Sequence, residues 1–147
     1  MALLLVRHAD AGDRDAWEGP DELRPLDRRG TAQAEALVGL LGNFDVERVL
    51  ASPYLRCTQT VEPLARARGL SVEACDALAA GNGRESLELV RRLGGAPVVL
   101  CTHGDVVGDV LEAMPAPSRP PMRKGSVWVL EAEDGDYVAA RYLPPPA

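Results

Sequence analysis

Residues 3–9 read LLLVRHA, an apolar run that leads directly into a cation and an imidazole. A short apolar run of this kind predicts a buried strand. Open α/β folds bind their ligands beyond the carboxyl ends of such strands, so we expect Arg7 and His8 at a ligand-binding rim. The second histidine, His103, also follows an apolar run, VVLC at 98–101. The two histidines of the chain therefore end two predicted strands in the same way.

Strand and helix patterns alternate along the rest of the chain. Apolar residues at helical spacing predict helices at about 32–41, 53–68, 84–93 and 105–114, and short apolar runs predict strands at 2–6, 48–51, 70–73 and 97–101. Residues 126–130 and 137–142 alternate in the β manner around a turn at 133–136, which predicts a hairpin. This order predicts a three-layer α/β/α sandwich, with a mostly parallel sheet and the hairpin as its antiparallel C-terminal edge. No repeat or boundary interrupts it, so residues 1–147 are expected to form a single domain.

Composition excludes several classes of protein. A length of 147 residues, with 46% hydrophobic and 26% charged residues, suits one globular domain. The net charge of −6 is unfavourable for binding a nucleic acid, so we expect no nucleic-acid partner. A local basic pocket for a phosphorylated ligand remains compatible with this charge. Cys57, Cys75 and Cys101 lack Cys-x-x-Cys spacing, so we expect no zinc site and a reducing cytosol. No signal peptide or membrane-spanning run is apparent, which predicts a cytoplasmic protein without a membrane partner.

Basic side chains gather at three predicted strand-to-helix junctions. Arg7 and His8 follow the first strand, Arg56 lies in SPYLRCTQT at 52–60, and His103 follows the fourth strand. Two guanidinium groups at one edge can hold the oxygens of a phosphoryl group, and helix N-termini add backbone donors. A neutral His8 can then attack phosphorus. His103 is best suited to donate to the phosphoryl oxygens.

Four segments resemble, in order, the motifs of the histidine phosphatase superfamily, the phosphoglycerate-mutase-like proteins. They are VRHA at 6–9, LDRRGTAQA at 26–34, SPYLRCTQT at 52–60 and THG at 102–104. The resemblance implies the phosphoglycerate-mutase-like fold, with His8 as the phosphorylated nucleophile and no metal or cofactor. It also implies a phosphate pocket made by Arg7, Arg56, His103 and Gly104. The chain is similar to the SixA-type phosphohistidine phosphatases and to the histidine-phosphatase half of some actinobacterial Nudix hydrolases.

Two positions depart from the family pattern. Ala9 replaces the usual glycine, which is tolerable if its φ is not positive. Ala80 stands where many members carry a glutamate general acid. Asp76, Glu85 or Asp105 are possible substitutes, and no spacing selects one of them. A sugar alkoxide gains roughly 10²–10⁴ in rate from such an acid, whereas an imidazole, acyl or phosphate leaving group needs it far less.

A polar segment at 10–25 is long for a connection inside a domain, and we expect it to be functional. Arg14, Arg24 and Arg28 in this first loop are candidates to meet an anionic substrate, with solvated loop charges as the alternative. Ser52 and Thr102 are expected to be either plain loop hydroxyls or groups that orient the two imidazoles.

The sequence therefore predicts a metal-independent phosphatase with a phosphohistidine intermediate. Its expected substrate is a phosphohistidine protein or a small phosphorylated metabolite. The likeness to the Nudix-fused domains leaves a nucleotide-directed phosphatase as one alternative. Ala80 leaves a non-catalytic phosphate-binding module as another, although a binding module has no need of the nucleophile His8.

Overall fold

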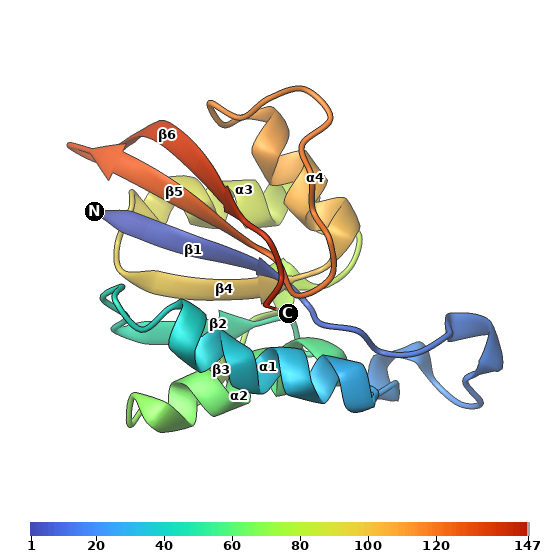
Figure 1. The fold of residues 1–147 in the computed structure, drawn as a ribbon. Helices are drawn as coiled ribbons and strands as arrows, with labels where there is room; N and C mark the ends of the chain where they lie inside the picture. The colour runs from blue at the N-terminus through green and yellow to red at the C-terminus, as the bar shows by residue number, and fades with distance from the viewer. Residues whose placement is uncertain (147) are drawn as a thin grey trace.

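The computed structural model describes residues 1–146, and Figure 1 shows a twisted sheet with helices on both of its faces. The strands are β1 (Ala2–Arg7), β2 (Arg48–Ala51), β3 (Val72–Ala74), β4 (Val98–Thr102), β5 (Val127–Glu133) and β6 (Asp136–Leu143). The helices are α1 (Arg28–Leu40), α2 (Leu55–Ala67), α3 (Gly83–Leu93) and α4 (Gly104–Glu112), with short 3-10 helices η1 (Arg14–Ala16), η2 (Asp21–Leu23) and η3 (Asp76–Leu78). None of the helices between residues 1 and 146 has the length and apolar character that a membrane crossing requires.

The six strands form one sheet in the order β3-β2-β4-β1-β5-β6. β1, β2, β3 and β4 pair in parallel, and the β5–β6 hairpin joins β1 in the antiparallel direction. The predicted three-layer α/β fold with an antiparallel edge hairpin is confirmed. The register pairs Arg7 with Thr102. His8 and His103 therefore leave two adjacent strands at the same level.

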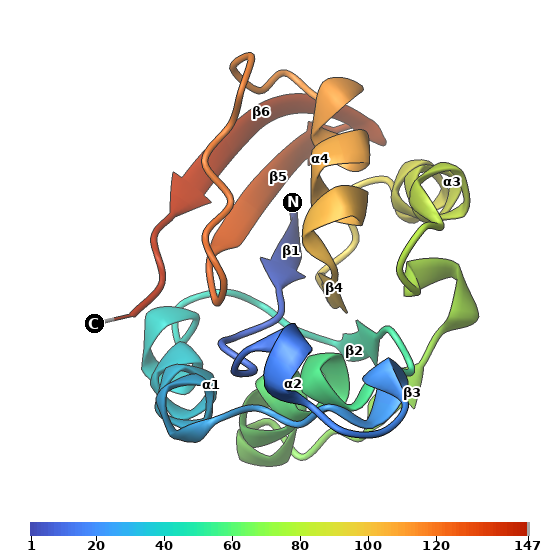
Figure 2. The same ribbon diagram turned by 90° about the vertical axis from the view of Figure 1, so that its right-hand side faces the viewer.

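The core is divided between the two faces of the sheet. Along β1, Leu3 and Leu5 pack on the face covered by α3 and α4, whereas Leu4 and Val6 pack on the face covered by α1 and α2 (Figures 1 and 2). Because both faces are buried, the strand is apolar without interruption, as parallel central strands are. This double burial holds the carboxyl end of β1 rigidly, and that end carries Arg7 and His8.

All four helices begin within four residues of the predicted positions, and the residues at the N-termini of α1, α2 and α4 account for three of the differences. α1 begins at Arg28 because the Asp27 side chain caps it, accepting a hydrogen bond from the Gly30 N–H at 2.8 Å. α2 begins at Leu55, since Tyr54 keeps an extended backbone, and Pro53 precedes the helix instead of lying in its first turn. α4 begins at Gly104, with His103 as its N-cap residue. His103 therefore stands directly at the positive end of a helix.

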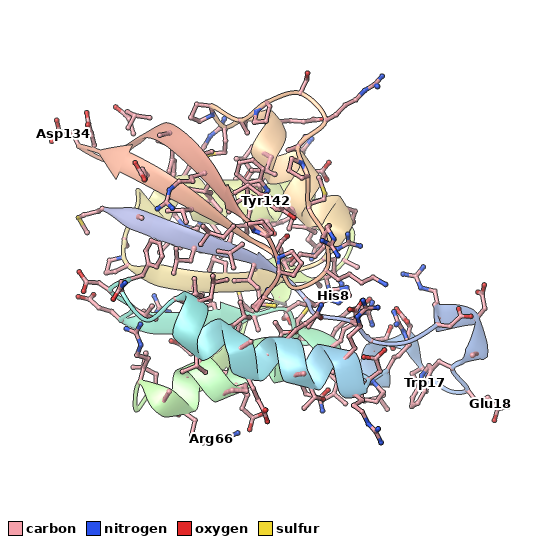
Figure 3. The ribbon with its side chains drawn as sticks, viewed as in Figure 1. His8, Trp17, Glu18, Arg66, Asp134 and Tyr142 are labelled. Atoms are coloured by element: carbon pink, nitrogen blue, oxygen red, sulfur yellow. The ribbon has the colours of Figure 1, made fainter. Side chains whose placement is uncertain are left out.

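The segment between β1 and α1 projects beyond the carboxyl ends of the strands, with Trp17 and Glu18 near its outer end (Figure 3). Arg24 anchors it from inside. Its buried guanidinium donates to the Ala11 carbonyl at 2.6 Å and to the Asp21 carboxylate at 3.1 Å. The predicted long loop is thus an ordered wall with two 3-10 helices, η1 and η2.

Candidate active site

An open pocket of about 730 Å³ lies at the carboxyl edge of the sheet, where His8 is seen in Figure 3. The pocket is lined by Arg7, His8, Arg14, Asp21, Arg56, Ala80, His103, Gly104, Asp105 and Met122. All five residues that the sequence suggested for a phosphate site are among them. They come from three β-to-α junctions that are far apart in the chain, and the parallel sheet brings these junctions together.

His8 is held as a neutral imidazole with one nitrogen available. Its Nδ1 lies 2.8 Å from the Ala9 carbonyl oxygen, which can only accept, so Nδ1 carries the proton and Nε2 keeps a lone pair. His8 as a whole is 5% exposed. Burial, reinforced by the charges of Arg56, His103 and Arg7, lowers the pKa of His8 to about 3, although the hydrogen bond to Ala9 acts the other way. The imidazole is therefore uncharged at neutral pH, with its single proton on Nδ1.

Ala9 fits its position without backbone strain. Positive φ angles at non-glycine residues in the described chain occur at Arg119 and Asp134, so Ala9 is not one of them. Its N–H donates to Thr60 Oγ1 at 2.9 Å, and the same hydroxyl donates to the Arg56 carbonyl at 2.6 Å. α2 thus fixes the N–H of Ala9, the residue whose carbonyl holds the His8 ring.

Arg56 is buried beneath the pocket and fixed by Asp21. Its side chain is 2% exposed and donates to the Asp21 carboxylate at 3.0 Å and to the Asp21 carbonyl at 2.9 Å. Burial works against ionisation of Asp21, but hydrogen bonds from Arg24 and Arg56 outweigh it and lower the pKa of this carboxyl group. Asp21 is therefore a fixed anion that orients the guanidinium of Arg56.

Arg7 lies against the start of α4. Its Nη1 donates to the Met122 carbonyl at 2.8 Å, and a Cβ added to Gly104 would come within 2.8 Å of its Cζ. Gly104 is thus the residue that leaves room for the guanidinium at the helix N-terminus. In residues 1–146, the buried side-chain nitrogen and oxygen atoms without a hydrogen-bond partner are Nε of Arg7 and Nε of Arg56. Two such cationic donors at one pocket favour an anionic ligand.

His103 is anchored through the opposite nitrogen from His8. Its Nε2 lies 2.8 Å from Ser52 Oγ, and the Tyr54 ring meets the imidazole edge-on at 4.6 Å. A Ser52 hydroxyl that donates to Nε2 leaves the proton on Nδ1 as a donor for a ligand. Ser52 therefore orients an imidazole, whereas Thr102 does not, because its hydroxyl donates to the Leu78 carbonyl.

Of the three carboxylates proposed as substitutes for the absent glutamate, one lines the pocket. Ala80 lines the pocket, so this position does face the site. Asp105 lines it as well, and its Oδ2 accepts from the Gly81 N–H at 2.8 Å. Asp76 in η3 and Glu85 in α3 are not among the lining residues.

Sequence reasoning missed three groups that shape the site. Thr60 is the last residue of the SPYLRCTQT motif at 52–60. It lies one helical turn after Arg56, and this spacing was the feature of the sequence that could have placed Thr60 near the site. Asp21 and the carbonyl of Met122 lie in irregular segments far from their arginine partners. No spacing in the sequence connects them to those arginines.

The sequence model of the histidine phosphatase superfamily (branch 1) matches residues 3–82, more than half of the chain. The chain belongs to this superfamily. The family prediction is confirmed. The matched range includes β1, the projecting loop, α1 and α2, and hence His8 and Arg56.

Two curated relatives of this chain carry more specific names. An 8-oxo-(d)GTP phosphatase of Mycolicibacterium smegmatis is 41% identical over 157 residues, which is 98% of this chain but 48% of the relative. The chain thus spans about half the length of that protein. Phosphohistidine phosphatase SixA of Escherichia coli is 30% identical over 83% of this chain and 79% of its own.

Solved structures of histidine phosphatases share the whole architecture. SixA complexed with tungstate superposes with a TM-score of 0.77 at 25% identity, covering 97% of this chain and 94% of that one. A SixA relative from Agrobacterium tumefaciens gives 0.78 at 26% identity, covering 99% and 98%. A mycobacterial glucosyl-3-phosphoglycerate phosphatase, at 19% identity and a TM-score of 0.75 over 96% of each chain, shares the fold.

Proposed function

We propose that this chain is a phosphatase that takes a phosphoryl group onto Nε2 of His8 and then passes it to water. One observation carries the proposal: the Ala9 carbonyl holds the proton on Nδ1, so that Nε2 keeps its lone pair in a pocket lined by cations. A site built only to bind phosphate would gain more from a charged imidazole than from a neutral one. The neutral His8 therefore favours catalysis over the binding module.

The first step forms an N–P bond and breaks the bond from phosphorus to the leaving group. Nε2 of His8 supplies the electron pair, and the leaving atom departs with the pair of the broken bond. Negative charge on the transferring oxygens is stabilised by Arg7, Arg56 and the Nδ1–H of His103, with backbone N–H groups at the α4 N-terminus. These groups supply the positive charge from side chains and backbone, so the proposed chemistry is metal-independent.

The proposed substrate is a phosphoryl group on a good leaving group, with phosphohistidine as the first candidate. Ala80 offers no proton for a departing alkoxide, whereas an imidazole leaving group needs less help. The likeness to SixA, a named phosphohistidine phosphatase, supports this class.

A nucleoside phosphoanhydride is the second candidate. The relative named 8-oxo-(d)GTP phosphatase is 41% identical over nearly the whole chain. A phosphate leaving group also departs readily without an acid, so the same pocket suits this chemistry. A small phosphorylated metabolite with a comparable leaving group belongs to the same chemical class.

The decisive experiment is mass spectrometry of the intact protein after brief incubation with phosphoramidate or acetyl phosphate. We expect an acid-labile, alkali-stable phosphoryl adduct on the wild-type protein and none on the His8→Ala variant. Absence of both an adduct and turnover would instead support the phosphate-binding module. Relative kcat/KM values for a phosphohistidine peptide and 8-oxo-dGTP then rank the two substrate classes.

A further inference from the structure

We propose that Asp105 is the catalytic base that accepts the proton of the attacking water when phospho-His8 is hydrolysed. This inference rests on the proposed function, because it concerns the second step of that reaction. It assigns a role to a carboxylate at the pocket edge that the resemblance to the family leaves open.

The hydrolysis step requires a proton acceptor. Water that bonds to phosphorus must lose a proton, and an acceptor at the site accelerates this loss. Three of the lining residues, Arg7, Arg14 and Arg56, already carry protons they do not release. His8 bears the phosphoryl group at this stage, and His103 is engaged as a donor. The remaining candidates in the pocket are two carboxylates, Asp21 and Asp105.

Asp21 is unsuited to the task. Its Oδ1 accepts from Arg24 at 3.1 Å and its Oδ2 accepts from Arg56 at 3.0 Å. Both oxygens are engaged by cations, and the lowered pKa of Asp21 makes this carboxylate a weaker base. Protonation would also release the guanidinium of Arg56 at the moment when the transition state needs it.

Asp105 has the opposite properties. It lies in the first turn of α4, two positions after His103, and it is exposed to the pocket opening. Oδ2 is tethered to the Gly81 N–H, next to Ala80, and within residues 1–146 Oδ1 makes no hydrogen bond. The tether fixes the carboxylate beside the site and leaves one oxygen to receive a proton.

Asp105 also interacts electrostatically with Arg7, one of the proposed phosphate-binding residues. Burial lowers the pKa of Arg7, and the carboxylates of Asp10 and Asp105 act in the opposite direction. Arg7 lies against Gly104, the residue between His103 and Asp105. Asp105 is therefore near the phosphoryl oxygens that Arg7 is placed to bind.

The role of a base follows from the free oxygen of Asp105. A carboxylate oxygen without a hydrogen-bond partner at the pocket edge can accept a proton from the attacking water. In the balanced step, water oxygen bonds to phosphorus and the N–P electron pair returns to Nε2 of His8. The water proton passes to Oδ1 of Asp105 and from there to solvent. The products are inorganic phosphate and neutral His8.

The Asp105→Asn variant tests this assignment, because the amide oxygen can still accept from the Gly81 N–H but cannot take up a proton. Rapid quenching with acetyl phosphate, followed by intact-mass analysis, measures formation and loss of phospho-His8 separately. We expect formation at the wild-type rate and hydrolysis slowed about 10²-fold or more, so that the phosphoenzyme accumulates. Asp76→Asn and Glu85→Gln are matched controls and should behave as wild type.

Two other outcomes would overturn the assignment. Hydrolysis of phospho-His8 at the wild-type rate in Asp105→Asn would show that another group accepts the proton. A slowed formation without accumulation would make Asp105 the acid of the first step. If neither the wild-type protein nor any variant forms an adduct, the proposed function itself fails, and the two failures are thereby distinguished.

Discussion

The two imidazoles in this pocket differ in which ring nitrogen is hydrogen-bonded to the protein. Nδ1 of His8 donates a hydrogen bond to the Ala9 carbonyl, whereas Nε2 of His103 lies 2.8 Å from the Ser52 hydroxyl. The two rings meet edge-on with centroids 5.6 Å apart. Opposite nitrogens are anchored, so Nε2 of His8 and Nδ1 of His103 are the ring nitrogens left for a ligand.

The burial of His8 as a neutral base should appear in the pH dependence of stability. The unfolded side chain takes up a proton near pH 6.5 and the folded one only near pH 3, so the unfolded state binds more protons between these values. We expect the free energy of unfolding to fall with decreasing pH more steeply than in His8→Gln, by at most about 1.4 kcal/mol per pH unit. Urea unfolding in phosphate-free buffer from pH 7 to pH 4 measures it. Parallel pH curves for the two proteins would contradict the neutral His8.

Helix α1 supports the nucleophile from a distance. A Cβ on Gly30, in its first turn, would come within 1.8 Å of the Asp10 carbonyl oxygen. The same carbonyl accepts from the Asp27 N–H at 3.1 Å, and the Asp10 N–H donates to Gln33 at 2.9 Å. The peptides after His8 are thus packed directly onto the start of this helix.

Gly30→Ala should therefore lower both stability and activity. The added methyl group meets backbone and cannot move aside, so we expect a loss of about 1–3 kcal/mol in the free energy of unfolding. We also expect slower phosphorylation of His8, because the Ala9 carbonyl shifts with the loop. Urea unfolding and the quenched-mass assay measure the two effects.

Gly39→Ala in the same helix is the matched control. No atom lies within 4 Å of a Cβ at this exposed position. Alanine should instead stabilise α1 by about 0.5–1 kcal/mol, without an effect on phosphorylation. Equal effects of the two substitutions would show that the contact between Gly30 and Asp10 does not support the site.

The pocket joins parts of the fold from both faces of the sheet. Arg56 belongs to α2 on one face, and Gly104 begins α4 on the other, with β1 and β4 between them (Figure 2). An anion held between Arg7 and Arg56 therefore links elements that separate on unfolding. Binding to the folded state alone raises its stability by mass action.

Tungstate should stabilise the protein through this pocket. At a concentration 100 times Kd, we expect about 2.7 kcal/mol of added stability. Thermal unfolding with and without tungstate measures the shift, with chloride at equal ionic strength as the reference. Arg56→Met and Arg7→Met should each lose most of the shift. An undiminished shift in both would place the anion elsewhere.

The order of the main helices and strands, the edge of the sheet that carries the site and four pocket residues (Arg7, His8, Arg56 and His103) were predictable from local patterns, whereas Gly104 followed from the resemblance to the family. Apolar periodicity is local, and parallel strands necessarily share one carboxyl edge, so residues that follow such strands meet there. This rule alone predicts that Arg7, His8 and His103 lie close together. Arg56 followed the same rule from the junction before α2.

Other features depend on packing between irregular segments, which no periodic pattern encodes. The pairing of Asp21 with Arg56 joins residues 35 positions apart, and the tether of Asp105 to Gly81 joins residues 24 apart. The separate roles of Ser52 and Thr102 depend on which neighbour each hydroxyl reaches. Hydropathy thus determines where the site lies, whereas side-chain contacts between distant segments determine which carboxylate holds an arginine and which remains open to take up a proton.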